Sequence, residues 1–211
     1  MAGQISGIIL SGGQNSRMKT NKAFLKIDNQ YIIENTISEL KKFCSEIIIV
    51  TNEPELYNNL GVKVITDIIP RRGPLSGIHA GLLAAGNFHS FVVACDMPFI
   101  NGELARYMVE HATDCDVLVP QVGDYLQPLF AVYSKNCLPP IENCLKRDVR
   151  KIIAFYHEVC VKYLSEIIIR KYVDTEKVFY NVNTPEELAR AQRWDSRQVG
   201  VEKEKETGGV K

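Results

Sequence analysis

Residues 7–22 read GIILSGGQNSRMKTNK, in which an apolar run leads directly into two adjacent glycines and then into basic residues. The first four residues are apolar, which is typical of the start of a strand buried on both faces of a parallel sheet. The adjacent Gly12 and Gly13 allow backbone N–H groups to surround an anion, and Arg17 and Lys22 follow closely enough to fold back over it. An ordinary strand-to-helix turn with solvated basic residues is the alternative, because neither a P-loop nor a GxGxxG pattern is present.

Four further short apolar runs indicate buried strands, and longer amphipathic stretches separate them. The runs are Glu46–Thr51, Val62–Thr66, Phe91–Ala94 and Val117–Val119. The helical candidates are Tyr31–Phe43, Leu75–Gly86, Gly102–Ala112 and Cys137–Leu145. This alternation predicts an α/β protein, a single-domain, three-layer, Rossmann-like fold whose mostly parallel sheet is flanked by helices. We place the domain at residues 1–192 and expect a disordered tail at 193–211, where the chain turns polar and its charges alternate.

Two proline-containing segments predict elements of the C-terminal half. Residues 127–133, QPLFAVY, indicate a further strand, and Pro128 restricts it to a sheet edge or to the beginning of the strand. Residues 183–187, NTPEE, indicate the start of a helix, with Asn183 as a candidate cap.

Composition excludes several classes of protein. The 211 residues include 25 Lys+Arg and 25 Asp+Glu, so the formal net charge is zero. A general nucleic-acid binder needs a basic excess to displace counterions, and no apolar run approaches the roughly 20 residues of a membrane span. The N-terminus lacks the layout of a signal peptide. The six cysteines form no CxxC pair, so we expect free thiols in a reducing compartment and a cytoplasmic protein without nucleic-acid or membrane partners.

Polar side chains follow three of the predicted strands. Asn52 follows the run Glu46–Thr51, Asp67 follows Val62–Thr66, and Asp96 comes just after Phe91–Ala94. Ligands of such sheets bind beyond the carboxyl ends of the strands. Mg²⁺ is usually held by one or two carboxylates plus phosphate oxygens, and Asp96 suits that role, although a loop or helix cap uses an aspartate equally well. Together with the glycine turn, these residues favour a nucleotide site.

A resemblance to a known family rests on residues 10–25, LSGGQNSRMKTNKAFL. They resemble the LxGGxSxRMGxxKxxL signature of nucleotidyltransferases of the nucleotide-diphospho-sugar transferase fold. The double glycine is similar to that of the molybdenum cofactor guanylyltransferases. The match continues through Asn52, Asp67 with GPLSGIHAGL, VVACDMPFI, QPLFAVY and YNVNTPEEL, and covers about residues 5–192. Lys19 stands where the family usually has Gly, and Asn21 where it often has Asp.

The resemblance implies that GMP is transferred from GTP to Mo-molybdopterin, forming molybdopterin guanine dinucleotide and releasing pyrophosphate. It implies that Arg17, Lys22 and Asp96 are catalytic and that Asp96 holds Mg²⁺, with Mn²⁺ as an alternative. The nucleotide contacts that it implies are Leu10, Ser11, Gly12, Gly13, Lys22, Asn52, Asp67 and Asp96.

The resemblance also implies that the N-terminal half binds the nucleotide and the C-terminal half binds the molybdenum cofactor. Candidate residues for the cofactor are Gln127, Pro128, Arg150, Lys151, Asn181 and Asn183. A solvated basic helix face is the alternative for the cluster around Arg150 and Lys151. GTP and the molybdenum cofactor are the expected substrates, and proteins that deliver the cofactor or mature molybdoenzymes are candidate transient partners.

Two other functions remain open from the sequence. A cytidylyl- or sugar-1-phosphate nucleotidyltransferase of the same fold would differ in nucleotide choice, which a comparison of GTP with CTP separates. A non-catalytic nucleotide-binding module would not need the intact Lys22 and Asp96.

Overall fold

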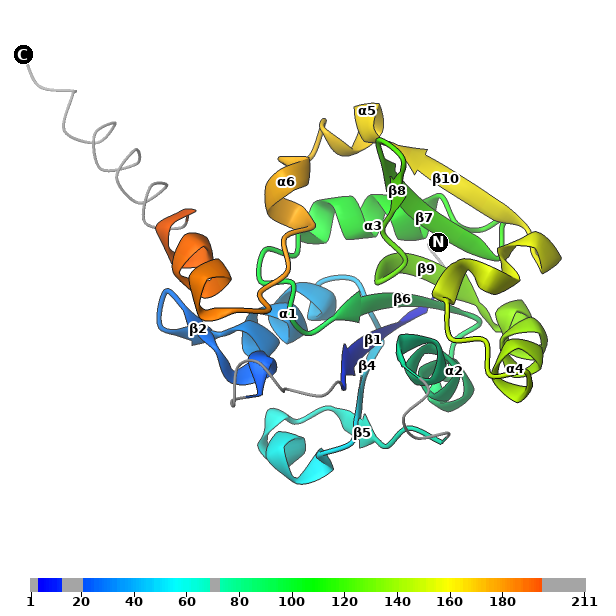
Figure 1. Cartoon of the computed structure of the whole chain (residues 1–211), viewed down its shortest axis with the longest axis horizontal. Coiled ribbons are helices and arrows are strands. Elements are labelled where there is room, and N and C mark those ends of the chain that lie inside the picture. Colours follow the sequence, from blue (N-terminus) through cyan, green and yellow to red (C-terminus); the bar gives the residue numbers. More distant parts are fainter. Residues whose placement is uncertain (1–3, 13–20, 69–72, 195–211) are drawn as a thin grey trace, which may run out of the picture.

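The computed structural model describes residues 4–12, 21–68 and 73–194 of the chain, and helices lie on both faces of its main sheet (Figure 1). The strands are β1 (Ile5–Ser11), β2 (Lys26–Ile27), β3 (Gln30–Tyr31), β4 (Glu46–Thr51), β5 (Lys63–Ile65), β6 (His89–Ala94), β7 (Val117–Val122), β8 (Tyr125–Leu126), β9 (Phe130–Ser134) and β10 (Val161–Ser165). The α-helices are α1 (Ile32–Lys41), α2 (Pro74–Ala84), α3 (Gly102–Glu110), α4 (Leu138–Lys146), α5 (Glu166–Ile169) and α6 (Thr175–Val178). Short 3₁₀ segments are η1 (Lys22–Phe24), η2 (Pro54–Leu60), η3 (Lys135–Cys137) and η4 (Ile152–Glu158). Residues 185–194 are also helical.

The main sheet has the strand order β10-β7-β9-β6-β1-β4-β5, and β8 pairs with β7. β1 runs parallel to β4 on one side and to β6 on the other. Ser11 of β1 aligns with Thr51 of β4, and Leu10 aligns with Ala94 of β6. The carboxyl ends of three neighbouring strands therefore meet at one edge of the sheet, where ligands of such folds bind.

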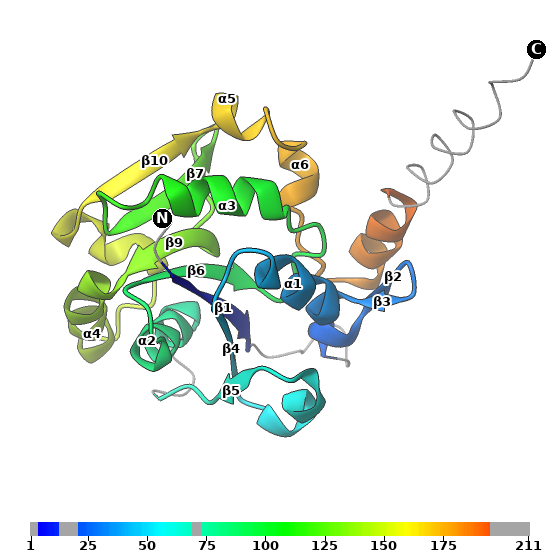
Figure 2. The same cartoon turned by 180° about the vertical axis from the view of Figure 1, so that it is seen from behind.

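Apolar side chains on both faces explain why the strand sequences are almost continuously hydrophobic. Ile5 and Ile9 of β1 join the core cluster that includes residues of α1 and α3, whereas Ile8 and Leu10 join the cluster under α2 and α4. Figures 1 and 2 show the two pairs of helices from opposite sides. The predicted α/β class and the flanked, mostly parallel sheet are confirmed.

β9 is the strand predicted from QPLFAVY, and it lies inside the sheet. It pairs antiparallel with β6 and with β7, so of the two predicted positions, a sheet edge or the beginning of a strand, the structure excludes the sheet edge. Pro128 precedes the first residue of β9 by two positions, and its missing N–H therefore removes no bond from the sheet.

A small hairpin and the C-terminal helix pack together next to the edge where β1 ends. β2 and β3 are joined by Asp28 and Asn29, whose positive φ values of 47° and 63° are those of a tight two-residue turn. Ile27 packs with Val182 and Ala191, so the helical residues 185–194 lie against the hairpin in both views (Figures 1 and 2). The helix thus includes residues 193 and 194 of the expected tail, and residues 195–211 lie outside the described part.

None of the described helices has the length and apolar character that a membrane crossing requires.

Candidate active site

Lys22, Asp96 and Asn183 meet at the edge where β1, β4 and β6 end, although they lie far apart in the sequence. The Lys22 ammonium donates to Asp96 Oδ2 at 3.3 Å and to Asn183 Oδ1 at 2.5 Å. The side chains of Lys22 and Asp96 are 22% and 20% exposed, so the ion pair is partly withdrawn from water but open to a ligand. A cation and a carboxylate held this way can grip phosphate oxygens directly or through a metal ion.

Lys22 is held in place by the turn that it begins. Asn21 is the N-cap of η1, and its Oδ1 accepts from the backbone N–H of Ala23 at 3.1 Å. Ala23 is fully buried, so η1 is anchored in the core immediately next to the partly exposed Lys22. The sequence predicts Lys22 as a phosphate ligand, and the structure adds the device that orients it.

Asn183 contacts Lys22 with its side chain and is not the helix cap. The cap is Thr184, whose hydroxyl accepts from Glu187 N at 3.2 Å. The Glu187 carboxylate accepts in return from the backbone N–H groups of Thr184 at 2.9 Å and Asn183 at 2.6 Å. This capping box fixes the Asn183 backbone and allows its carboxamide to meet Lys22. The alternative in which Asn183 serves only as a cap is therefore wrong.

Burial raises the pKa of both residues that follow β6, Cys95 and Asp96. It raises the pKa of the Asp96 carboxyl, the nearby Glu187 carboxylate adds to the rise, and the Lys22 ammonium opposes it. Burial also raises the pKa of the Cys95 thiol to about 12, and the adjacent Asp96 charge adds to this rise. Cys95 therefore stays protonated at neutral pH and is not a thiolate nucleophile.

The structure describes some, but not all, of the residues near the glycine turn that are predicted to contact the nucleotide. Leu10 and Ser11 end β1, and a Cβ built on Gly12 would lie 3.7 Å from the Asn52 carboxamide nitrogen. Gly12 and the exposed Asn52 are thus neighbours across the ends of β1 and β4. Gly13 and Arg17 lie outside the described residues, and their predicted roles stay predictions.

Asp67 lies beyond the end of β5, beside the first turn of α2. Its carboxylate accepts a hydrogen bond from the Ser76 hydroxyl. Asp67 is half-buried, and it follows β5 as the exposed Asn52 follows the neighbouring β4. The two residues therefore lie at the same edge of the sheet.

Gln127 and Pro128 lie beside the end of β6. The backbone N–H of Ala94 donates to Leu129 O at 3.1 Å, which brings the 127–129 segment next to the residues that lead to Asp96. The buried Tyr133 hydroxyl donates to Pro128 O at 2.7 Å and fixes this turn.

Asn181, Arg150 and Lys151 are not joined to the Lys22–Asp96 pair by any contact found in the described part of the chain. The Asn181 carboxamide donates to Phe179 O at 3.1 Å. Arg150 is exposed and paired with Asp148 at 3.0 Å, and Lys151 is exposed as well. Both basic residues lie in the loop between α4 and η4 and not on a helix face.

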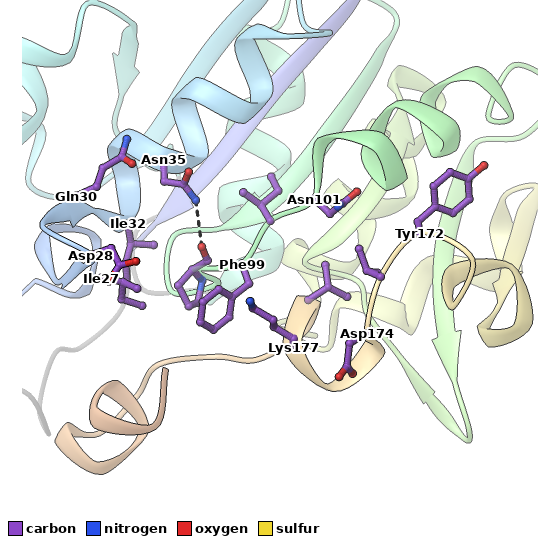
Figure 3. A pocket seen from close by; sticks show the side chains of 14 residues that line it. Ile27, Asp28, Gln30, Ile32, Asn35, Phe99, Asn101, Tyr172, Asp174 and Lys177 are labelled. Atoms are coloured by element: carbon purple, nitrogen blue, oxygen red, sulfur yellow. Dashed lines mark hydrogen bonds between the residues drawn. The ribbon is translucent and has the colours of Figure 1, made fainter. Parts of the chain in front are cut away.

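A cavity of about 540 Å³ lies beside the segment that follows Asp96 (Figure 3). Asn35 of α1 donates to Pro98 O at 3.1 Å, the dashed contact in Figure 3, and the Lys177 ammonium lies 4.8 Å from the centre of the Phe99 ring. None of the predicted site residues lines this cavity. The contacts in its wall brace the chain between Asp96 and α3.

Three residues outside the predicted set support the site. The Tyr57 hydroxyl lies 2.5 Å from the Ser11 hydroxyl, and Glu53 accepts from the Asn21 carboxamide at 3.0 Å. Glu187 closes the capping box described above. Glu187 has a detectable signal, because Thr184 and Glu187 have the spacing of a capping box. Tyr57 and Glu53 lie in and before η2, where no recognisable motif marks them.

The residues fit a single divalent ion that arrives with phosphates. The described residues contain no cluster of three or more His, Cys, Asp or Glu side chains that could hold a metal ion by themselves. Mg²⁺ sites commonly use one or two carboxylates and take their other ligands from substrate phosphates and water. Asp96, a partly exposed carboxylate at the end of a buried strand, is a suitable ligand of that kind.

A strand-end carboxylate, a lysine held against it and a glycine turn define a nucleotidyltransferase of the α/β type. Comparisons with known proteins agree, since residues 7–160 match the family model of the MobA-like NTP transferase domain. The chain is 47% identical over 188 residues to a probable molybdenum cofactor guanylyltransferase of Pelotomaculum thermopropionicum, covering 89% of this chain and 92% of that protein. It therefore belongs to the molybdenum cofactor guanylyltransferase family.

Further relatives support this membership. A molybdenum cofactor guanylyltransferase of Desulfosudis oleivorans is 38% identical over 191 residues, covering 89% of this chain and 94% of that protein. The crystal structure of molybdopterin-guanine dinucleotide biosynthesis protein A from Archaeoglobus fulgidus superposes with a TM-score of 0.78 at 26% identity. It covers 91% of this chain and 99% of that one.

Proposed function

We propose that this protein transfers GMP from GTP to Mo-molybdopterin, forming molybdopterin guanine dinucleotide and releasing pyrophosphate. The observation that carries the proposal is the junction of Lys22, Asp96 and Asn183 at the carboxyl ends of β1 and β6, in a chain of this family. The cytidylyl- or sugar-1-phosphate alternative shares the fold, but the relatives at 38% and 47% identity carry guanylyltransferase names. Intact Lys22 and Asp96 speak against a non-catalytic module.

The chemistry requires alignment and charge stabilisation. A terminal phosphate oxygen of the molybdenum cofactor bonds to the α-phosphorus of GTP, the bond from that phosphorus to the β-bridging oxygen breaks, and pyrophosphate leaves with its electrons. The attacking group is already anionic, so no side chain has to remove a proton. The four histidines contact Glu142, Cys115, Tyr107 and Glu158, which agrees with a reaction that needs no histidine as a base.

Each residue of the junction has a role in this scheme. The Lys22 ammonium neutralises charge on the phosphates, and Asn183 holds that ammonium in place. Mg²⁺, or Mn²⁺ as the alternative, would be bound by Asp96 and would neutralise charge on the phosphate oxygens. Ser11, Gly12, Asn52 and Asp67 would contact the nucleotide.

The cofactor substrate would occupy the C-terminal half of a domain at residues 1–192. Gln127 and Pro128, beside the end of β6, are the best-placed candidates to contact it. Arg150 and Lys151 would serve as a phosphate grip, and Asn181 would line the same side. Cytoplasmic location, and transient contact with cofactor-delivering or maturation proteins, stay predictions.

Nucleotide choice tests the proposal. Purified protein is incubated with Mg²⁺, Mo-molybdopterin and GTP, CTP or ATP in parallel, and the dinucleotide product is identified by mass spectrometry. We expect the guanine dinucleotide from GTP and little product from the other two. Equal or better use of CTP would show that the protein is a cytidylyltransferase instead.

A further inference from the structure

We propose that Asn21 is a positioning residue for Lys22, and that Glu53 makes a carboxamide, and not a carboxylate, necessary at position 21. The inference rests on the proposed function, because that function is what gives Lys22 its role at the phosphates. The contacts themselves do not depend on any substrate.

Two groups of fixed polarity set the orientation of the Asn21 carboxamide. Its Oδ1 accepts from the backbone N–H of Ala23 at 3.1 Å, and a backbone N–H can only donate. Its Nδ2 donates to Glu53 Oε2 at 3.0 Å, and an ionised carboxylate can only accept. The carboxamide therefore joins η1, which begins with Lys22, to the residue that precedes η2.

The second hydrogen on Nδ2 has a partner too. Nδ2 lies 3.0 Å from the Tyr57 hydroxyl, which lies 2.5 Å from the Ser11 hydroxyl at the end of β1. Tyr57 is fully buried, and its ring packs 5.1 Å from that of Phe24, the last residue of η1. Asn21 thus connects Lys22 to the end of β1 as well as to Glu53.

A carboxylate at position 21 would break this arrangement. Aspartate retains the oxygen that caps η1, but its other oxygen would face Glu53 at about the distance of the present hydrogen bond. Two carboxylates so close repel each other, so either the exposed Glu53 or the side chain at position 21 would have to move away. Because Glu53 lies at hydrogen-bond distance from position 21, an amide suits this position better than a carboxylate does.

The experiment compares Asn21→Asp, Glu53→Gln and the double variant in the full chain. Asn136→Asp is the matched control, because Asn136 Nδ2 donates to the Asp116 carboxylate at 2.8 Å, away from the site. The first readout needs no substrate: the rate at which an amine reagent labels Lys22, followed by peptide mass spectrometry. The second is kcat and KM for GTP, measured separately.

We expect Asn21→Asp to speed Lys22 labelling by about threefold or more, because Lys22 is released from its fixed position. We expect kcat/KM for GTP to fall by roughly tenfold, chiefly through kcat, since a displaced group loses transition-state alignment. Glu53→Gln alone and the double variant should both behave like the wild type, because the carboxamide introduced by Glu53→Gln offers an acceptor or a donor as required. Asn136→Asp should leave both readouts unchanged.

The proposal would be overturned if Asn21→Asp labelled Lys22 at the wild-type rate. It would also be overturned if adding Glu53→Gln to Asn21→Asp did not return the labelling rate to that of the wild type. Should Asn21→Asp not fold, Asn21→Ser keeps a capping oxygen but loses both amide contacts, and the same increase in labelling is expected. If the wild type makes no dinucleotide but labelling responds as described, the proposed function fails while the positioning role stands.

Discussion

Lys22 shows how one side chain acquires a function from its neighbours. Its ammonium meets one charged and one neutral acceptor, Asp96 and Asn183, that come from different parts of the chain. Both Lys22 and Asp96 are about one-fifth exposed, so their attraction is less screened than that of a surface pair. An anionic ligand that enters this site meets a cation that is already oriented.

Replacing Lys22 by methionine keeps the length of the side chain and removes its charge. We predict that Lys22→Met lowers kcat/KM for GTP by about 10²- to 10³-fold, since a preorganised charge at the phosphates is lost. Steady-state kinetics measure the effect. Lys26→Met is the matched control, because Lys26 is a nearby exposed lysine whose ammonium lies over the Tyr31 ring. Equal losses in the two variants would mean that Lys22 has no special role.

Sequence patterns predict the residues that carry charge but not those that hold them. Lys22 and Asp96 stand in motifs next to predicted strand ends, and the structure brings them together. Tyr57 and Glu53 contribute through contacts across more than thirty residues of chain, in a 3₁₀ segment without hydrophobic periodicity. No local pattern encodes such contacts, so only the structure shows them.

Close packing between α2 and β1 fixes the position of β1. A Cβ on Gly81 of α2 would lie 2.6 Å from Ile8 Cγ2, and Ile8 is a fully buried, β-branched residue of β1. A Cβ on Gly77, one turn earlier, would lie 3.2 Å from Leu10 Cδ2, the end of a more flexible side chain. The helix can approach the strand this closely because position 81 has no side chain.

Alanine at these two positions should therefore have different effects. We predict that Gly81→Ala lowers the free energy of unfolding by about 1–3 kcal/mol, because overpacking outweighs the better helix propensity. Gly77→Ala should change it by less than about 1 kcal/mol, since Leu10 can move slightly and alanine favours the helix. Urea titration measures both. A Gly81→Ala variant as stable as the wild type would contradict the close approach of α2 to β1.

Continuous apolar strands are predicted well, and half-exposed elements are missed. β4 has the predicted bounds, and β1 and β6 are each longer than predicted. β10 was not predicted because most of its side chains are exposed or half-buried, which leaves no apolar run. β9 lies inside the sheet although Pro128 is close to it. Proline removes a sheet hydrogen bond only when it lies within the strand, and Pro128 lies before β9.

Hydrogen bonds to Asp116 link the segments next to β7, β9 and β10 in the C-terminal part of the sheet. Asp116, just before β7, accepts from the Ser134 hydroxyl at 2.8 Å and from Cys160 N, before β10, at 3.0 Å. Burial by itself would raise the pKa of Asp116, but hydrogen bonds from Cys160, Asn136 and Ser134 outweigh it, so the pKa lies below its ordinary value.

This lowered pKa gives the contribution of Asp116 a defined pH dependence. A carboxylate with a depressed pKa in the folded state stabilises above its unfolded-state pKa of about 3.9, and the stabilisation is lost as the pH falls through the folded-state value. We predict that Asp116→Asn costs about 1–2 kcal/mol of unfolding free energy at pH 7 and progressively less below about pH 4. Urea denaturation across this pH range measures it.

Asp114→Asn is the control for this prediction, because Asp114 is exposed and its ion pair with Lys162 lies on the surface. It should cost clearly less unfolding free energy at pH 7 than Asp116→Asn does, because solvent screens an exposed ion pair. A cost for Asp116→Asn that is independent of pH, or no larger than that of Asp114→Asn, would show that the charge of Asp116 does not join the strands.

Pyrophosphate release is the direct measure of guanylyl transfer at this site. It is measured for the wild type and Asp96→Asn with GTP, leaving out Mg²⁺ or Mo-molybdopterin in turn. We predict that wild-type release requires all three components and that Asp96→Asn lowers it by about 10²-fold or more, because the strand-end carboxylate is lost. Wild-type protein that releases no pyrophosphate with all components present, or Asp96→Asn that releases it undiminished, would contradict guanylyl transfer at this site.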